Sequence, residues 1–228
     1  MSRAIDTRAL PEGQLLIEIP ETQRKQPRQA RSIAMVEALK QAAVQILEDE
    51  GRDALSLSRL SEYSGVSVSS IYEYFPTLDS LISSIFDEYR KRQHAELLED
   101  IRRLPDSSML YDGLLLMLRT FLRLRRKQWL IDRVFSAKYL HYSELQRMDL
   151  VKPDSLPQAE LTSALMQRFS TELAEQDAEK AMFLAYHALP ALTRAVALER
   201  PLYLEQDDTA QMIARMLHAL LCKPNTMP

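Results

Sequence analysis

The stretch from Ser56 to Phe75 constrains the fold of this chain more than any other part of the sequence. It reads SLSRLSEYSGVSVSSIYEYF, and its apolar positions fit two short helices joined by a tight turn. Ser56 and Ser67 each precede one helical pattern, where a hydroxyl can accept hydrogen bonds from unpaired N–H groups. Gly65 follows the first pattern, where a left-handed residue ends a helix at least cost. The stretch therefore predicts a helix-turn-helix.

The second helix of this motif has a polar outward face. Hydroxyls and a phenol at the start of a short helix suit base edges and phosphates in the major groove of DNA. The residues expected to face outward are Ser69, Ser70, Tyr72, Glu73 and Tyr74. Short helix pairs with a glycine turn also occur in all-α proteins that never contact DNA, so the motif alone leaves both interpretations open.

The motif and its flanks resemble the DNA-binding domain of TetR-type regulators. The resemblance covers about residues 28–103 and rests on Gly51, Ser56–Leu60, Gly65–Ser67, Ile71–Phe75 and Leu81. It implies a homodimeric, ligand-responsive transcription factor with a variable C-terminal effector domain. Two features depart from the family pattern. The small pair in the recognition helix is Ser69-Ser70, and Leu78 stands where relatives carry a lysine that contacts phosphate.

The composition favours helices throughout the chain. Hydrophobic residues make up 46% of the 228 residues and only 4 are glycine, which excludes a mostly disordered chain. No run of alternating β-branched residues of strand length occurs between residues 28 and 222. With the resemblance, this predicts an all-α fold, in which an N-terminal three-helix DNA-binding domain precedes a C-terminal helical domain for ligand binding and dimerisation.

Cysteine content and hydropathy indicate a compartment. Cys222 is the only cysteine, so an internal disulfide is impossible and a reducing cytosol fits. No stretch approaches the roughly 18 consecutive apolar residues of a membrane span. The apolar run Gln14–Ile19 is too short for a signal peptide. We expect a cytoplasmic protein without membrane association.

The charge pattern is local rather than global. A net charge of −3 argues against a general nucleic-acid binder. Phosphate binding needs only a local positive patch, however, and one precedes and enters the first helix. It consists of Arg24, Lys25, Arg28, Arg31 and Lys40, opposed by Glu37 alone.

The expected organisation has four parts. Residues 1–27 carry three prolines and one glycine without a helical period, which predicts a mobile arm. The basic end of this arm could follow the DNA backbone or remain solvated. Residues 28–76 form the DNA-binding domain and residues 77–103 a connecting helix capped by Thr77. Residues 104–228 form the helical effector-binding and dimerisation domain.

Two helices of the C-terminal domain are assigned to dimerisation, about Gln158–Glu175 and Ala178–Glu199. The second is rich in alanine, which lets helices approach closely and favours a four-helix bundle between two copies. Alternatively, these alanines pack only inside one copy. Pro190 should kink this helix. In a last helix, Asp208–Leu221, the residues expected to pack inward are Met212, Met216, Leu217 and Leu220.

The C-terminal domain also has more methionine and aromatic side chains than its core obviously needs. Flexible methionines with a few polar tips suit a mostly apolar small molecule, although for any one of these residues plain core packing is favoured over ligand contact. The candidates for lining a ligand cavity are Met117, Phe121, Trp129, Phe135, Tyr139, Met166, Phe169, Phe183, Tyr186 and His187. His187, near the expected kink, is the best candidate for a polar contact.

Other chemistry is not expected. The four histidines are dispersed, and we identify no glycine-rich phosphate loop or nucleophile motif, so the sequence predicts no metal site, cofactor or catalysis. It predicts a homodimer that represses transcription from an inverted-repeat operator and is released by a small molecule. The alternatives are an activator, a helical protein-interaction module, or a small-molecule binding protein without DNA binding.

The expected DNA contacts fall into two groups. Phosphate contacts are assigned to Arg28, Arg31, Ser56, Arg59 and Tyr74. Base contacts are assigned to Ser67, Ser69, Ser70 and Tyr72, with Glu73 available to a cytosine amino group.

Overall fold

The computed structural model describes residues 23–25, 27–147, 157–174 and 177–222. These residues form helices joined by turns and contain no β-strand, which confirms the predicted all-α fold. The arm predicted for residues 1–27 lies outside the described residues except for residues 23–25 and 27.

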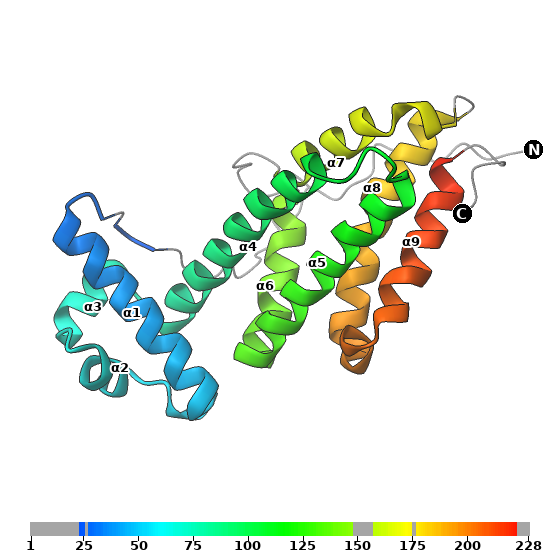
Figure 1. Ribbon diagram of the computed structural model, residues 1–228. Helices are drawn as coiled ribbons and strands as arrows, with labels where there is room; N and C mark the ends of the chain where they lie inside the picture. Colours follow the sequence, from blue (N-terminus) through cyan, green and yellow to red (C-terminus); the bar gives the residue numbers. More distant parts are fainter. Residues whose placement is uncertain (1–22, 26, 148–156, 175–176, 223–228) are drawn as a thin grey trace, which may run out of the picture.

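The N-terminal domain consists of three helices and the start of a fourth (Figure 1). Its helices are α1 (Ala30–Asp49), α2 (Leu57–Ser64) and α3 (Val68–Tyr74), with a 3-10 turn at Arg52–Ala54. The predicted caps are confirmed. The Oγ of Ser56 accepts a hydrogen bond from the N–H of Arg59 (3.1 Å), and the Oγ of Ser67 accepts one from the N–H of Ser70 (3.3 Å). Gly65 ends α2 with φ of 70°, as the turn requires.

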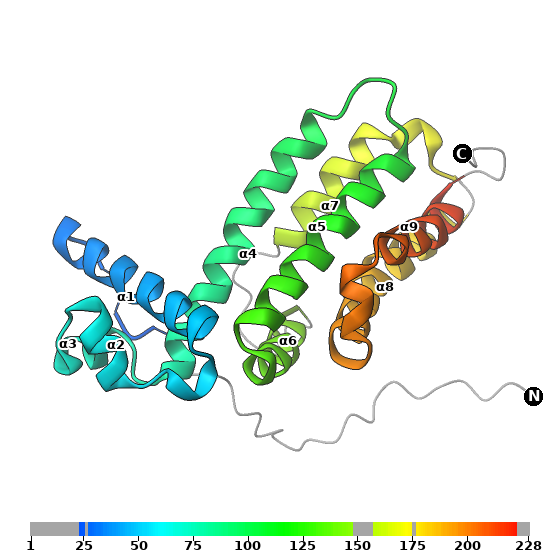
Figure 2. The same cartoon turned by 60° about the horizontal axis from the view of Figure 1, so that its bottom comes forward.

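Helix α4 (Leu78–Arg102) connects the two domains (Figures 1 and 2). Thr77 begins it with a reciprocal capping box, in which the Thr77 Oγ1 accepts from the Ser80 N–H at 3.0 Å and the Ser80 Oγ accepts from the Thr77 N–H at 3.2 Å. Its first turns bury Leu81 and Phe86 in the N-terminal core, and its last turns bury Leu97 in the C-terminal core. One rigid helix is therefore part of both cores.

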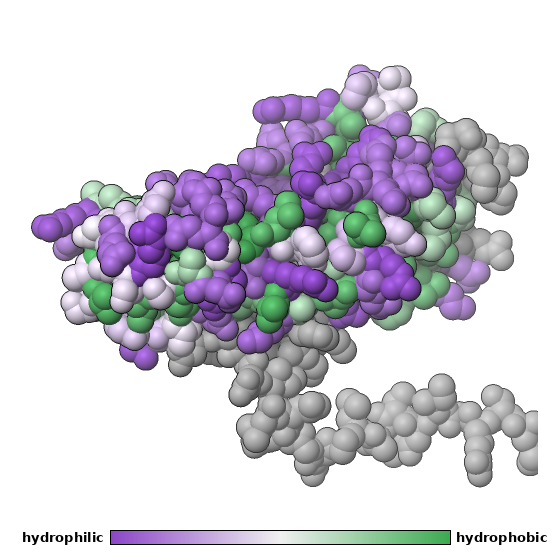
Figure 3. All heavy atoms as spheres, turned by 90° about the horizontal axis from the view of Figure 1, so that it is seen from below, coloured by the Kyte–Doolittle hydropathy of each residue, from purple (hydrophilic) through white to green (hydrophobic). Residues whose placement is uncertain are grey.

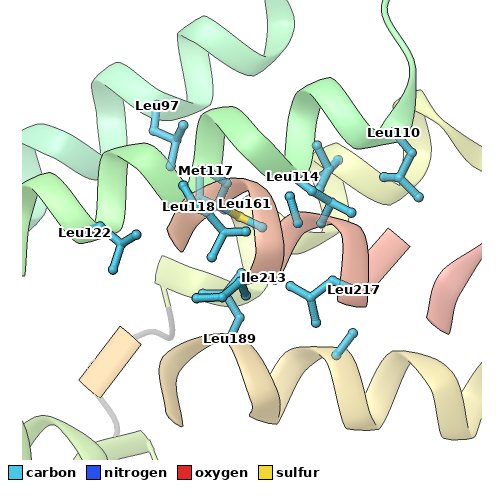
Figure 4. Close-up of a cluster of buried hydrophobic side chains, with 14 of the residues drawn as sticks. Leu97, Leu110, Leu114, Met117, Leu118, Leu122, Leu161, Leu189, Ile213 and Leu217 are labelled. Atoms are coloured by element: carbon cyan, nitrogen blue, oxygen red, sulfur yellow. The ribbon is translucent and has the colours of Figure 1, made fainter. Parts of the chain in front are cut away.

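The C-terminal domain is built around α5. Its helices are α5 (Leu110–Ile131), α6 (Arg133–Arg147), α7 (Pro157–Arg168), α8 (Ala178–Glu199) and α9 (Asp207–Leu221), with 3-10 turns at Ser170–Glu172 and Pro201–Glu205. Helix α5 packs against α4, α8 and α9. Leucine, isoleucine and methionine side chains from these helices fill the core between them (Figure 4).

Two sequence expectations about this domain are wrong. The first is the extent of the helix expected at about Gln158–Glu175: it is α7, which ends at Arg168 and packs against α4, and its assignment to dimerisation stays a prediction. The second concerns the last helix. Met212 and Met216 are exposed, whereas Ile213 and Ala214 take the buried positions. The inward face is therefore shifted by about one residue around the helix.

Candidate nucleic-acid interface

The exposed side of α3 carries the groups predicted to contact DNA bases. The hydroxyl oxygen of Ser67 lies 3.1 Å from that of Ser69 and 2.9 Å from that of Ser70, so the three form one hydrogen-bonded cluster at the start of the helix. One turn further on, Tyr72 has 46% of its surface exposed and Glu73 is also exposed. Helix α3 thus presents hydroxyls, a phenol and a carboxylate to solvent.

Tyr74 does not belong to this outward face, so the sequence prediction for it is wrong. Tyr74 is only 5% exposed and packs in the N-terminal core with Ile71 and Phe75. These three residues follow i, i+3, i+4 spacing, which places them on one side of the helix. The pattern was visible in the sequence, but the phenolic hydroxyl was interpreted as a polar contact.

The residues before α1 place positive charge beside α3. The backbone N–H of Arg24 donates a hydrogen bond to the carbonyl oxygen of Tyr74 at 3.0 Å. The Lys25 Nζ lies 3.9 Å from a carboxylate oxygen of Glu73 and 5.6 Å from the ring centroid of Tyr74. Arg28 and Arg31 are exposed, and neither forms an ion pair with another described residue. Arg28 and Arg31 therefore remain available to phosphate, whereas Lys25 is paired with Glu73.

Two other basic residues are already paired inside the N-terminal domain. Arg59 forms a bidentate contact with the Glu50 carboxylate, with Nη2–Oε1 at 2.6 Å and Nε–Oε2 at 3.1 Å. These hydrogen bonds lower the pKa of Glu50 and raise the pKa of Arg59. Lys40 lies 2.9 Å from Glu88 on α4 and 3.3 Å from Glu37. The charges of Arg59 and Lys40 are therefore largely neutralised before any DNA arrives.

A small cavity lies between α5, α7, α8 and α9. Its volume is about 20 Å³, which is room for roughly one water molecule. Three of the predicted ligand contacts line it, namely Met117, Met166 and Tyr186. The lining residues that the sequence did not single out are Leu114, Thr162, Met182, Ala185, Leu189, Leu217 and Leu221. They are ordinary core residue types, so no sequence signal marks them.

Several other predicted ligand contacts lie away from this cavity. Phe121 and Phe169 pack in the C-terminal core, and the Trp129 ring lies 5.7 Å from the Arg133 guanidinium carbon. Phe183 is 60% exposed, and its ring centroid lies 4.4 Å from that of His187. Plain packing and an exposed surface account for these residues better than a cavity does.

Phe135 and Tyr139 belong to the junction between the two domains, which the sequence prediction missed. Both are on α6, are 2% exposed and pack with Phe86 of α4, at ring-centroid distances of 5.6 and 5.3 Å. The Tyr139 hydroxyl donates to an Asp87 carboxylate oxygen at 2.7 Å, and burial raises the pKa of Tyr139. Helix α6 is thereby joined to the N-terminal core.

A charged contact adjoins this junction. Asp132, 4% exposed, immediately precedes α6, and its Oδ1 accepts a hydrogen bond from the Phe135 N–H at 2.9 Å. Its Oδ2 lies 2.8 Å from the Arg52 Nε, but without hydrogen-bond alignment, so this contact is an ion pair only. Arg52 also contacts Asp79 at 3.2 Å. The turn before the helix-turn-helix is therefore tied to the residue that precedes α6.

Comparison with known proteins agrees with this architecture. Residues 39–85 match the family model described as bacterial regulatory proteins, tetR family. A structure described as a TetR-family transcriptional regulator from Mesorhizobium loti MAFF303099 is 16% identical, with 86% of this chain and 100% of that chain covered and a TM-score of 0.59.

A second similar structure concerns the control of antibiotic production by bacterial hormones. It is 20% identical, with 86% of this chain and 100% of that chain covered and a TM-score of 0.52. At these identities the two structures show a shared fold. No curated protein sequence matches the chain at a significant level. The helix-turn-helix region thus matches the DNA-binding domain of the tetR family of bacterial regulatory proteins, and the chain shares the fold of a TetR-family regulator.

Proposed function

We propose that the protein is a cytoplasmic repressor that binds an inverted-repeat operator as a homodimer and leaves it when a mostly apolar small molecule binds. The observation that carries this proposal is the exposed polar face of α3 beside exposed basic residues. Ser69 and Tyr72 face solvent, and Lys25, Arg28 and Arg31 flank the same end of the domain. Hydroxyl and phenol groups can read base edges, while the cations hold the phosphate backbone.

The DNA contacts divide between two surfaces. We assign base contacts to Ser67, Ser69, Ser70, Tyr72 and Glu73, and phosphate contacts to Arg28, Arg31 and Ser56. Arg59 contacts Glu50 through its Nε and Nη2, and its Nη1 lies 3.6 Å from Glu62, so these carboxylates compete with phosphate for it. The paired Arg59 therefore limits affinity for DNA of any sequence.

The proposed dimer rests on apolar side chains that one copy leaves exposed on α8 and α9. These helices lie side by side at the end of the molecule far from the helix-turn-helix (Figures 1 and 2). Their exposed apolar residues are Phe183, Leu184, Leu198, Met212, Met216 and Leu220. Figure 3 shows apolar residues interrupting the polar surface on one face of the molecule. Pairing α8 and α9 with their symmetry mates would bury the exposed apolar side chains in a four-helix bundle.

The length and composition of α8 also fit a membrane span. Helix α8 is the candidate among the described residues, and 33% of its apolar window is buried. A helix–helix interface explains the same composition, because Ala185 and Leu189 already pack in the domain core. The proposed dimer buries the remaining apolar side chains without a membrane.

Release by a ligand would act through α4 and α6. The cavity in this conformation has room for roughly one water molecule, so a larger ligand must move the helices around it. Helix α4 is part of both cores, and α6 contacts the N-terminal core directly. In a dimer bound to DNA, the two recognition helices must be separated by the roughly 34–36 Å between successive major grooves. A ligand that favours displaced helices would thus change this separation.

The proposal is tested by selecting the duplexes that bind the purified protein from a random DNA pool. Fluorescence anisotropy then measures the affinity for the most enriched duplex across a series of salt concentrations. Enrichment of an inverted repeat with a steep negative salt dependence supports an operator-binding dimer. Failure of a folded dimer to enrich any sequence, at low salt as well, would contradict it and favour a protein-interaction module.

Replacing Tyr72 with alanine is expected to weaken binding of the selected operator by roughly 1–3 kcal/mol, because the exposed phenol is lost from the base-reading face. Anisotropy measures this loss on the operator and on a scrambled duplex. Tyr63 is a matched control, since it is 49% exposed but lies on α2. Tyr63→Ala should keep the ratio between the two affinities, and an unchanged ratio in Tyr72→Ala would remove Tyr72 from base recognition.

Replacing Glu50 with glutamine is expected to tighten DNA binding by roughly 2- to 10-fold, because Arg59 then becomes available to phosphate. The log–log salt dependence should steepen by about 0.9, the value for one added phosphate contact. Asp49→Asn removes the same charge from the neighbouring residue without freeing Arg59, so its salt dependence should not change. Equal slopes in both variants would show that Arg59 does not reach the backbone.

A further inference from the structure

Three side chains of metal-binding type meet where the end of α9 lies against the turn after α7. Glu172, His218 and Cys222 each contribute one donor atom, and these atoms lie within 4.8 Å of one another. His218 and Cys222 are four residues apart at the end of α9, so they share one face. A backbone hydrogen bond from the Ala174 N–H to the Leu221 carbonyl oxygen, 2.9 Å long, holds the turn beside the helix.

The histidine of this cluster is buried with an unsatisfied nitrogen. His218 is 3% exposed, and its Nε2 has no hydrogen-bond partner among the described residues. The ring of Tyr111 packs edge-on against the imidazole with centroids 6.1 Å apart, which restricts its rotation. Buried polar nitrogens normally have a partner, so the unsatisfied Nε2 points to a ligand at this position.

The carboxylate of the cluster is held in place by the start of α5. Both oxygens of Glu172 accept from the N–H of Leu110, each at 3.1 Å. Each carboxylate oxygen has two lone pairs, so one contact with this N–H leaves capacity for a cation. Hydrogen bonds of this kind orient metal ligands in protein sites.

We propose that Glu172, His218 and Cys222 bind a divalent transition-metal ion of the zinc class. Thiolate, imidazole and carboxylate are the donors that Zn²⁺ takes in proteins, and three protein ligands leave a fourth position for water or another ligand. Binding converts the Cys222 thiol to a thiolate and releases its proton to solvent. At zinc–ligand distances the donors would stand roughly 3.5 Å apart, so any donors that lie further apart than this must approach one another on binding.

This proposal reverses the sequence expectation that the dispersed histidines exclude a metal site. The four-residue spacing of His218 and Cys222 was present in the sequence and was overlooked. Glu172 comes from a different element, so no local spacing could reveal it. The site would fasten the turn after α7 to the end of α9, whose Leu217 and Leu221 line the cavity.

The test is a titration of the reduced, full-length protein with Co²⁺. Cys222 is the only cysteine, so a thiolate-to-cobalt charge-transfer band reports on this site alone. The expected result is a band that saturates at one equivalent and is removed by Zn²⁺. Glu172→Gln and His218→Ala should each weaken Co²⁺ binding by about tenfold or more. His94→Ala is the matched control, because His94 pairs with Glu160 elsewhere, and it should bind like the wild type.

Two results would overturn the proposal. One is the absence of a charge-transfer band in folded wild-type protein. The other is a band whose affinity is the same in Glu172→Gln and His218→Ala as in the wild type, which would mean that the thiol alone binds the ion. Circular dichroism checks folding, and if His218→Ala does not fold, Glu172→Gln decides. A Zn²⁺-dependent rise in Tm of the wild type, lost in Glu172→Gln, is the independent readout.

Discussion

Replacing Phe135 with alanine is expected to lower the free energy of unfolding by about 3–5 kcal/mol, the usual cost of removing a buried phenylalanine. Phe135 is 2% exposed and meets Phe86 edge-to-face with centroids 5.6 Å apart. Edge-to-face contact adds to the area that the two rings bury. Because Phe86 belongs to α4 and Phe135 to α6, the cavity left behind lies between the two domains.

Urea denaturation measures this loss, followed by far-UV circular dichroism and by the fluorescence of Trp129, the only tryptophan. Phe169→Ala is the matched control, since Phe169 is 4% exposed but lies within the C-terminal core. Both variants should lose similar stability. Only Phe135→Ala should let the N-terminal domain unfold, or be cut by a protease, before the rest of the chain. Loss of less than about 1 kcal/mol in Phe135→Ala would show that the junction is not a packed core.

The same junction explains how the C-terminal domain could control the recognition helices. Asp132 caps α6 and forms an ion pair with Arg52, and Arg52 also contacts Asp79 near the start of α4. A shift of α6 along its axis would carry Asp132 with it and change the position of the turn that precedes α2. Asp132 is buried while the Arg52 side chain is 39% exposed, so separating the pair would leave a buried carboxylate without its cation. A ligand that moves α6 would therefore act on this contact.

Local rules explain which parts of the fold could be predicted from the sequence. The caps at Ser56, Ser67 and Thr77 and the left-handed Gly65 depend only on neighbouring residues, and the structure confirms all four. Helix α8 begins and ends at the predicted residues for the same reason, because turn residues bound its apolar pattern. The recognition helix could therefore be identified before any tertiary contact was known.

Tertiary contacts decided the predictions that were wrong. Phe135 and Tyr139 are aromatic residues of the C-terminal half, but nothing local shows that they pack against the N-terminal core. The pairing of Arg59 with Glu50 joins α2 to the end of α1, so the sequence could count the charge but not its partner. Likewise, the helical spacing from which Met212 was predicted to point inward also fits a helix face that points outward and contacts a second copy.

Replacing Phe183 with aspartate is expected to convert the proposed dimer to monomers. Phe183 lies on α8 and is 60% exposed in one copy, so folding of the monomer does not depend on it. In a two-fold symmetric interface the substitution occurs twice. At about 2 kcal/mol for each lost contact, the dimer dissociation constant should rise roughly 1000-fold. Sedimentation velocity across micromolar concentrations measures the change.

The control for this variant is Val134→Asp, which places the same charge at a residue that is 69% exposed on α6. Val134→Asp should remain dimeric, and a Phe183→Asp protein that sediments like it would contradict the assigned interface. The monomer also tests the link between dimer and operator. Each recognition helix would then bind a half-site alone, so affinity for the inverted repeat should fall by about 100-fold or more. Affinity for a single half-site should not change, because α3 and its basic flank lie far from the substituted surface (Figure 1).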